Sequence, residues 1–110
     1  MNQNQTVRYI CRTNEISRKK PFVFQVSEME QLVVFQSEGE YYAVENRCPH
    51  AGAFLHEGLV EKRVLTCIWH GWRFDLESGQ SLDEYWARLK TYPILVREGK
   101  LYLAEVDSTG

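Results

Sequence analysis

Two short cysteine and histidine pairs constrain this 110-residue chain more than any other feature of its sequence. The first pair is Cys-Pro-His at residues 48–50, and the second is Cys-Ile-Trp-His at residues 67–70. Sixteen residues separate the pairs, enough for one strand out and one strand back. The spacing therefore predicts two facing loops on which two thiolates and two imidazoles converge on one metal site.

The residue types alone admit two kinds of metal site. One is a tetrahedral zinc ion with four protein ligands, and the other is a two-iron, two-sulfide cluster with cysteines on one iron and histidines on the other. A zinc site of this composition usually separates its cysteines from its histidines around a helix, whereas each pair here is mixed. After the second pair, Trp72, Phe74 and Leu76 alternate with polar residues, which is typical of a strand.

The two pairs resemble the Rieske iron-sulfur family, whose motif is C-x-H, a spacer near sixteen residues, and C-x-x-H. The resemblance implies one [2Fe-2S] cluster. Cys48 and Cys67 would bind the inner iron, and His50 and His70 would bind the outer, more exposed iron. The flanking residues that also match the two cluster loops of the family are Pro49, Ala51, Gly52, Leu55, Gly58, Gly71, Trp72, Phe74, Asp75 and Gly79.

The rest of the chain consists of short β-rich segments joined by glycine-containing turns, with almost no helical period. Strands are expected near residues 6–12, 22–26, 32–35, 41–44, 72–76, 92–96 and 101–106, with a hairpin over 59–66 that pivots at Glu61-Lys62. Residues 81–89 are expected to form a loop with one helical turn. This pattern favours a single all-β domain over residues 1–110, an antiparallel β-sandwich or small barrel. The resemblance implies an inserted cluster-binding subdomain at about residues 46–80.

Composition excludes several partners and compartments. The net charge of −2 gives no electrostatic footprint for nucleic acid or for an anionic membrane. No apolar run approaches the roughly 18 residues of a membrane span, and the first residues lack a secretory signal, so a cytoplasmic location is expected. Cys11 has no partner within the chain and is expected to be a buried thiol on a strand.

The resemblance also bears on redox potential. High-potential respiratory members carry a disulfide between the cluster loops, where this chain has Ala53 and Trp69. They also carry two hydroxyl donors to the cluster, where this chain has Trp72 and Phe74. Fewer donors stabilise the reduced cluster less, so a low potential is expected. His56 has no partner at ligand spacing and is expected at the surface or behind the ligands.

The function implied is electron transfer without catalysis, because these residues hold no mononuclear-iron domain of the kind that Rieske oxygenases carry. The leading hypothesis is a low-potential Rieske ferredoxin that carries single electrons between a reductase and a terminal oxygenase. Pro49, Ala51, Phe54 and Trp69 would form an apolar collar around the exposed histidine side. One alternative is the small subunit of assimilatory NADH-dependent nitrite reductase, which both motifs also resemble. The other is a non-redox binding module stabilised by zinc.

Overall fold

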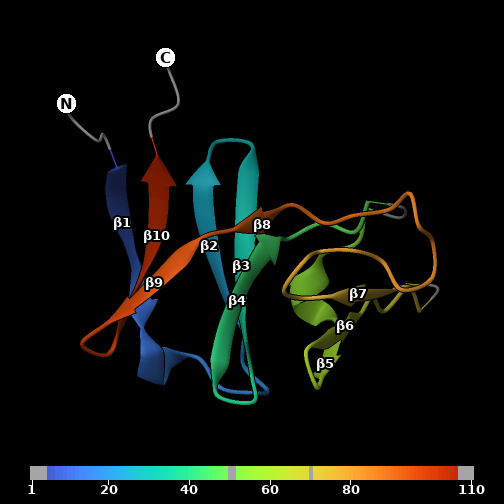
Figure 1. Cartoon of the computed structure of the whole chain (residues 1–110), viewed down its shortest axis with the longest axis horizontal. Helices are drawn as coiled ribbons and strands as arrows, with labels where there is room; N and C mark the ends of the chain where they lie inside the picture. The colour runs from blue at the N-terminus through green and yellow to red at the C-terminus, as the bar shows by residue number, and fades with distance from the viewer. Residues whose placement is uncertain (1–4, 50–51, 70, 107–110) are drawn as a thin grey trace.

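The computed structural model describes residues 5–49, 52–69 and 71–106, and almost all of its regular structure is β-strand (Figure 1). In chain order the elements are β1 (Gln5–Arg12), η1 (Thr13–Glu15), β2 (Phe22–Ser27), β3 (Glu30–Ser37), β4 (Glu40–Glu45), η2 (Leu55–Glu57), β5 (Leu59–Glu61), β6 (Val64–Thr66), β7 (Arg73–Asp75), β8 (Thr91–Tyr92), β9 (Ile94–Arg97) and β10 (Lys100–Val106). The elements η1 and η2 are single turns of 3-10 helix, and no helix in the described part of the chain could span a lipid bilayer. The predicted all-β class is confirmed.

Within the described ranges, the strands form three antiparallel sheets, with orders β1-β10-β9, β2-β3-β4-β8 and β5-β6-β7. Figure 1 shows the four-stranded sheet in the middle of the long axis, with the other two sheets towards opposite ends. Each sheet is open. The strands of the described residues therefore form stacked sheets and not the closed small barrel that was the second expectation for the fold.

Successive side chains of a strand point to opposite sides. Strand β3 has a core on each side, so both of its faces are buried. Leu32 and Val34 face a core shared with the β1-β10-β9 sheet, whereas Val33 and Phe35 face a second core shared with the β5-β6-β7 sheet. A strand between two cores needs apolar residues at consecutive positions, which explains the uninterrupted Leu-Val-Val-Phe run.

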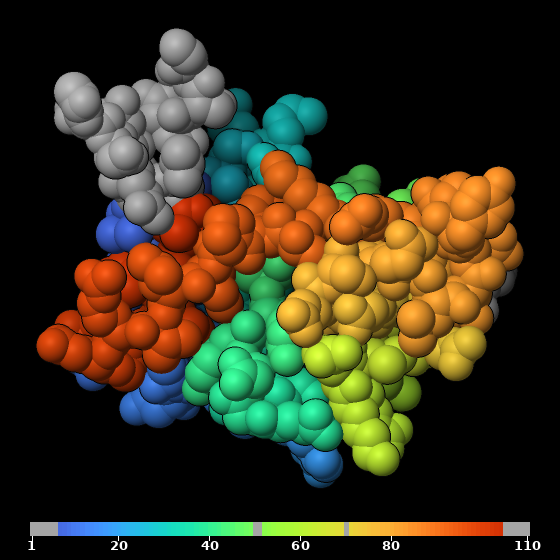
Figure 2. Space-filling view, viewed as in Figure 1, coloured from blue at the N-terminus to red at the C-terminus, as the bar shows by residue number. Residues whose placement is uncertain are grey.

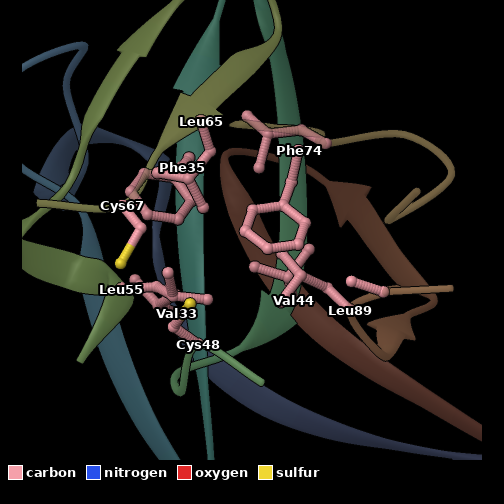
Figure 3. Close-up of a cluster of buried hydrophobic side chains, with 11 residues drawn as sticks. Val33, Phe35, Val44, Cys48, Leu55, Leu65, Cys67, Phe74 and Leu89 are labelled. Carbon is pink, nitrogen blue, oxygen red and sulfur yellow. The ribbon is translucent and has the colours of Figure 1, made fainter. Parts of the chain in front are cut away.

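The second core, called here the loop-side core, brings together strands and loops from much of the chain (Figure 3). Its buried members are Val33, Phe35, Val44, Cys48, Leu55, Leu65, Cys67, Phe74, Leu76, Ala87 and Leu89. The first core, called here the base core, contains Ile10, Cys11, Ile16, Leu32, Val34, Ala43, Leu101 and Leu103. Both of the cysteines predicted to bind metal therefore belong to the loop-side core, and Cys11 belongs to the base core.

Pro93 marks the point where the chain leaves one sheet and joins another. It lies between β8, at the edge of the four-stranded sheet, and β9, at the edge of the β1-β10-β9 sheet. Proline has no N–H to give to a ladder, so an edge position is expected for it. Its carbonyl still accepts a hydrogen bond of 2.9 Å from the Ala104 N–H.

Three hairpins close through two-residue loops in which both residues have positive φ, namely Glu38-Gly39, Lys62-Arg63 and Glu98-Gly99. This is the geometry that matches the twist of the flanking strands. The middle loop corrects the sequence prediction, because the hairpin pivots one residue later than Glu61-Lys62. Neither Lys62 nor Arg63 is a glycine, so no local signal marks the turn.

Residues 81–89 return over the β5-β6-β7 sheet as a series of turns, and they form the lighter orange surface at the right-hand end of the molecule in Figure 2. Arg73 fastens this segment. Its guanidinium bonds Asp83 at 2.9 and 3.3 Å, its N–H donates to the same carboxylate at 2.8 Å, and its carbonyl accepts from Leu82. The small sheet lies inside residues 46–80. The division into one domain with a subdomain over that range stays a prediction.

Candidate metal centre

The structure places the thiols of Cys48 and Cys67 side by side in the loop-side core. Cys48 follows β4, Cys67 follows β6, and each residue is only 1% exposed. Figure 3 shows both sulfurs on one side of the loop-side core. Burial raises the pKa of the Cys67 thiol, and the adjacent Cys48 thiol raises it further. Among the described residues, which include all three cysteines, no disulfide forms.

Two loops with the same backbone closure present these thiols. The Cys48 N–H donates to the Ala53 carbonyl at 2.8 Å, and the Cys67 N–H donates to the Trp72 carbonyl at 2.8 Å. In both loops the acceptor lies five residues after the cysteine. The closure turns each loop back on itself, so each cysteine stands at the base of its own loop.

A glycine with positive φ makes both closures possible. Gly52 has φ +71° and Gly71 has φ +70°, and each lies four residues after its cysteine. Only glycine adopts this conformation without steric cost. Both loops share the spacing Cys-x-x-x-Gly, which is a sequence signal for their matching backbone closure. This signal does not depend on the positions of the histidines.

Of the four predicted ligands, the described residues include Cys48 and Cys67, while His50 and His70 lie outside them, as does Ala51. No group of three metal-binding side chains therefore occurs in the part of the chain that the structure describes. The residues present fit a metal centre by their donor chemistry. Two adjacent buried thiols without a disulfide suit thiolate ligation of one metal ion. The assignment of all four ligands stays a prediction.

The thiols are backed by apolar side chains that exclude water. Leu55, Leu65 and Phe74 are completely buried in the loop-side core, and the half-buried Trp72 packs against it. Phe74 offers no hydrogen-bond donor, at one of the positions where the family resemblance implies hydroxyl groups in high-potential members. A dry site of this kind favours the neutral form of a metal cluster over the charged one.

The outer side of the two loops is apolar and exposed. Of the predicted collar, Pro49, Phe54 and Trp69 are exposed. The structure adds Trp86, a residue that the sequence did not indicate. Its side chain is more than half exposed, and its ring packs edge to face on the Trp72 ring, with the two centroids 5.5 Å apart. The 81–89 segment therefore extends the apolar collar beyond the two cluster loops.

His56 is half-buried and takes part in a polar contact that the sequence did not indicate. Its backbone N–H donates to the Asn46 carboxamide oxygen at 2.8 Å, and its ring Nδ1 lies 3.1 Å from the Asn46 nitrogen. Its ring also lies near that of Phe54, with centroids 5.7 Å apart. The His56 side chain is therefore in contact with Asn46 and Phe54.

The fold is that of a small antiparallel β protein that brings two buried thiols together at the bases of two loops. The family model for the Rieske [2Fe-2S] domain matches residues 6–93, and this chain belongs to that family. The resemblance recognised in the two motifs is thereby confirmed.

Two known relatives of this chain agree with its assignment to the family. The chain is 34% identical over 95 residues to the ferredoxin component of the alkene monooxygenase system of Xanthobacter autotrophicus, covering 86% of this chain and 77% of the relative. It is 34% identical over 81 residues to the ferredoxin component of the naphthalene 1,2-dioxygenase system of Pseudomonas aeruginosa, covering 73% of this chain and 77% of the relative.

Two solved structures share the fold over nearly the whole chain. One is a complex of reduced oxygenase and oxidised ferredoxin in carbazole 1,9a-dioxygenase, with TM-score 0.80, 25% identity and coverage of 94% of both chains. The other is described as the small subunit of an NADH-dependent nitrite reductase from Mycobacterium tuberculosis, with TM-score 0.83, 24% identity and coverage of 94% and 97%.

Proposed function

We propose that this chain is a Rieske ferredoxin, an electron-transfer component that carries one electron at a time from a reductase to a terminal oxygenase and is not itself a catalyst. The observation that carries the proposal is the pair of adjacent, buried thiols at Cys48 and Cys67 on two loops of matching closure. Two relatives that are each 34% identical to this chain are named as ferredoxin components of oxygenase systems.

The proposed cofactor is one [2Fe-2S] cluster held by Cys48, His50, Cys67 and His70, which when bound supplies a one-electron couple. Two ferric ions, two sulfides and two thiolates sum to a neutral centre, whereas four thiolates would leave it with a double negative charge. A neutral centre accepts an electron more readily. The chain's part is to hold the two thiolates in a dry core and to leave the outer side of the loops open to a partner.

The potential is proposed to lie towards the low end of the Rieske range, which runs from roughly −150 to +300 mV. Phe74 is buried without a donor, and Ala53 and Trp69 cannot form a disulfide between the loops. Both features reduce the stabilisation of the reduced state. A potential near the upper end of this range would contradict this part of the proposal.

The proposed partners are proteins, a reductase and an oxygenase, that dock against the exposed apolar side of the loops. The likeness to the nitrite reductase small subunit is one of fold alone at 24% identity. The ferredoxin relatives at 34% identity favour the first hypothesis.

A cytoplasmic location is part of the proposal, supported by three cysteines that form no disulfide in the described residues.

Metal and sulfide analysis of the protein purified without oxygen tests the proposal. The expected result is two irons and two acid-labile sulfides per chain, with an electron paramagnetic resonance signal that appears on reduction by one electron. Replacement of His50 or His70 by Cys is expected to lower the potential if a cluster still assembles, because each change adds a thiolate charge. Stoichiometric zinc in a colourless protein would establish the zinc-stabilised module instead.

A further inference from the structure

Asn46 is a buried polar residue two positions before Cys48. Among the described residues the buried polar side chains are Ser37, Asn46 and Ser81, and Asn46 is only 3% exposed. A buried carboxamide is costly unless its donors and acceptors are satisfied, so its contacts indicate what it holds together.

The Asn46 carboxamide connects three segments of the chain. Its Oδ1 accepts the His56 backbone N–H at 2.8 Å, and its Nδ2 donates to Gln31 Oε1 at 3.1 Å. Its Nδ2 also lies 3.1 Å from His56 Nδ1. The backbone adds one more bond, from the Asn46 N–H to the Gln31 carbonyl at 3.0 Å.

The backbone partner fixes the orientation of the carboxamide. The His56 N–H can only donate, so the group that faces it is the oxygen Oδ1. The nitrogen Nδ2 then faces the Gln31 side-chain oxygen and the His56 ring. One side chain thus binds the beginning of β3 on one side and the helical turn η2 on the other.

These contacts close the first cluster loop into a ring. Residues 46 and 56 lie on either side of the loop, and the Asn46 carboxamide joins them. The bonds of Cys48 with Ala53 and Gly52 hold the loop together internally but do not attach it to a sheet. The hydrogen-bonded attachment of this loop to β3 runs through Asn46 and Gln31, and it adds to the packing of Leu55 in the loop-side core.

We propose that Asn46 is the positioning residue for Cys48, which it holds at a fixed place relative to β3 and therefore relative to Cys67. This inference rests on the proposed function, in which both thiolates bind one iron. Without the carboxamide, the loop is held less firmly to β3, and its internal bonds are expected to open more often. The change would alter the geometry at the thiolate-bound iron.

Three variants of the full chain test the proposal. Asn46→Ala removes all the carboxamide contacts. Asn46→Asp keeps an oxygen for the His56 N–H. If Asn46→Ala fails to fold, Asn46→Asp is the variant that is compared with the wild type. Ser37→Ala is the matched control, because Ser37 is equally buried at 3% exposure and accepts one backbone bond, from Arg63 at 3.0 Å, outside the cluster loops.

Amide hydrogen exchange at single-residue resolution gives a readout that does not require the cluster. In Asn46→Ala the amides of His56, Cys48 and Gly52 are expected to exchange about tenfold faster, as loss of one well-formed hydrogen bond implies. The amide of Cys67 in the second loop is expected to keep its protection. Asn46→Asp is expected to restore most of the protection, and Ser37→Ala to leave all four amides unchanged.

In the protein loaded with iron and sulfide, Asn46→Ala is expected to shift the electron paramagnetic resonance g values and the midpoint potential. Asn46→Asp is expected to return the g values towards those of the wild type. Because its added charge changes the potential by itself, the g values are the criterion of rescue. Ser37→Ala is expected to lower thermal stability with both quantities unchanged.

Equal protection of the Cys48 amide in Asn46→Ala and the wild type would overturn the proposal, as would wild-type g values and potential in that variant. So would effects of the same kind and size in Ser37→Ala, since Asn46 would then contribute only general stability. A wild-type chain that binds no iron-sulfur cluster would refute the proposed function. The exchange data would still decide whether Asn46 positions the first loop.

Discussion

Cysteine occurs in two different environments in this chain, and the surroundings decide its chemistry. Cys48 and Cys67 lie next to each other at the bases of two loops. Cys11 is just as buried, but it lies on β1 in the base core with no other thiol near it. Burial, with a smaller contribution from the charge of Glu15, raises the pKa of Cys11 to about 11. We infer that Cys11 is a packing residue.

Cys11→Ala tests that inference. The variant is expected to bind as much iron as the wild type and to lose about 1 kcal/mol of unfolding free energy, the cost of removing one small buried group. In the folded wild type, Cys11 is expected to resist alkylation at pH 8, because the reactive thiolate is scarce well below the pKa. Iron analysis, urea unfolding and mass spectrometry measure the three results. A loss of iron in Cys11→Ala would contradict the separation of Cys11 from the site.

At the scale of elements, glycines with the same backbone conformation meet different surroundings. Gly52 in the first cluster loop has φ +71°, and no described atom lies within 4 Å of the position that a side-chain carbon would take there. Gly79, after β7, has φ +82°, but a side-chain carbon at this position would lie 2.2 Å from the Leu89 carbonyl oxygen. The Leu89 N–H donates to the Gly79 carbonyl at 2.7 Å, so the two backbones are in close contact.

Gly52→Ala and Gly79→Ala therefore form a matched pair. Gly52→Ala is expected to cost roughly 1–2 kcal/mol of unfolding free energy, the strain of a left-handed backbone. Gly79→Ala carries the same strain and also forces the 81–89 segment away from β7, so it is expected to cost at least about 2 kcal/mol more. Urea unfolding of both variants measures the difference. Equal losses would show that the close approach at Gly79 contributes nothing.

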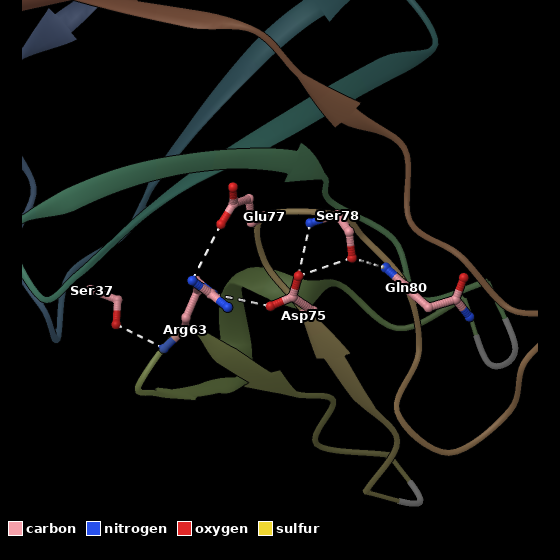
Figure 4. A network of polar contacts seen from close by, with 6 residues as sticks. All are labelled: Ser37, Arg63, Asp75, Glu77, Ser78 and Gln80. Atoms are coloured by element: carbon pink, nitrogen blue, oxygen red, sulfur yellow. Dashed lines mark hydrogen bonds and ion pairs between the residues drawn. The ribbon is translucent and has the colours of Figure 1, made fainter.

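A polar network joins the turn between β5 and β6 to the end of β7 (Figure 4). Arg63 bonds Asp75 at 3.1 Å and Glu77 at 3.2 Å, while Asp75 also accepts the Ser78 N–H and hydroxyl. Burial by itself raises the pKa of Asp75. The bonds from Ser78 and Arg63 outweigh it and hold the pKa below the ordinary value of 3.8.

The lowered pKa of Asp75 predicts a pH dependence of stability. Its carboxylate contributes stability that is fully present above the unfolded-state pKa and is lost as the pH falls through the lower, folded-state pKa. Asp75→Asn is therefore expected to be less stable than the wild type at pH 7, with a difference that shrinks below about pH 5. Urea unfolding of both chains at several pH values measures it, and any acid lability of the metal site that the two share cancels. A constant difference down to pH 3 would contradict the assignment.

The hairpins show why the sequence predicted some turns and not others. Glu38-Gly39 and Glu98-Gly99 carry glycine where a positive φ is needed, and each lies between two strands that the sequence predicts. Lys62-Arg63 lacks glycine, and its conformation is held from outside. The Arg63 N–H donates to Ser37, and its carbonyl accepts from Leu76. Contacts between segments distant in sequence leave no local signal, so this turn was misplaced by one residue.

At the candidate metal centre, too, the sequence predicted local features and missed contacts between distant segments. The motif spacing predicted that Cys48 and Cys67 belong to one centre, because covalent order and loop length constrain it directly. Asn46 and Trp86 could not be predicted, since their roles arise from Gln31, His56 and Trp72, partners that folding brings to them. An asparagine before a motif and a tryptophan in a polar loop resemble many surface residues.

On the scale of the whole molecule, the two cores differ in what they depend on. The base core is made by three long strands, β1, β3 and β10, together with β4 and the segment at Ile16. The loop-side core also uses one face of β3 and of β4, but the rest of it depends on β5, β6 and β7, each of three residues, and on the loops that carry the two thiols. A sheet of such short strands has little stability of its own, so the metal centre is expected to stabilise this end of the molecule.

Removal of iron is therefore expected to loosen one end of the chain and leave the other folded. After reduction and chelation, amides of β5, β6, β7 and both cluster loops are expected to lose most of their hydrogen-exchange protection, because a bound metal stabilises the segments that hold its ligands. Amides of β1, β3 and β10 around the base core are expected to keep most of theirs, since no predicted ligand lies in that core. Reconstitution of the same sample with iron and sulfide should restore the original pattern. Uniform loss across both cores would show that the chain unfolds as one cooperative unit, and unchanged protection throughout would show that the small sheet is stable without the metal.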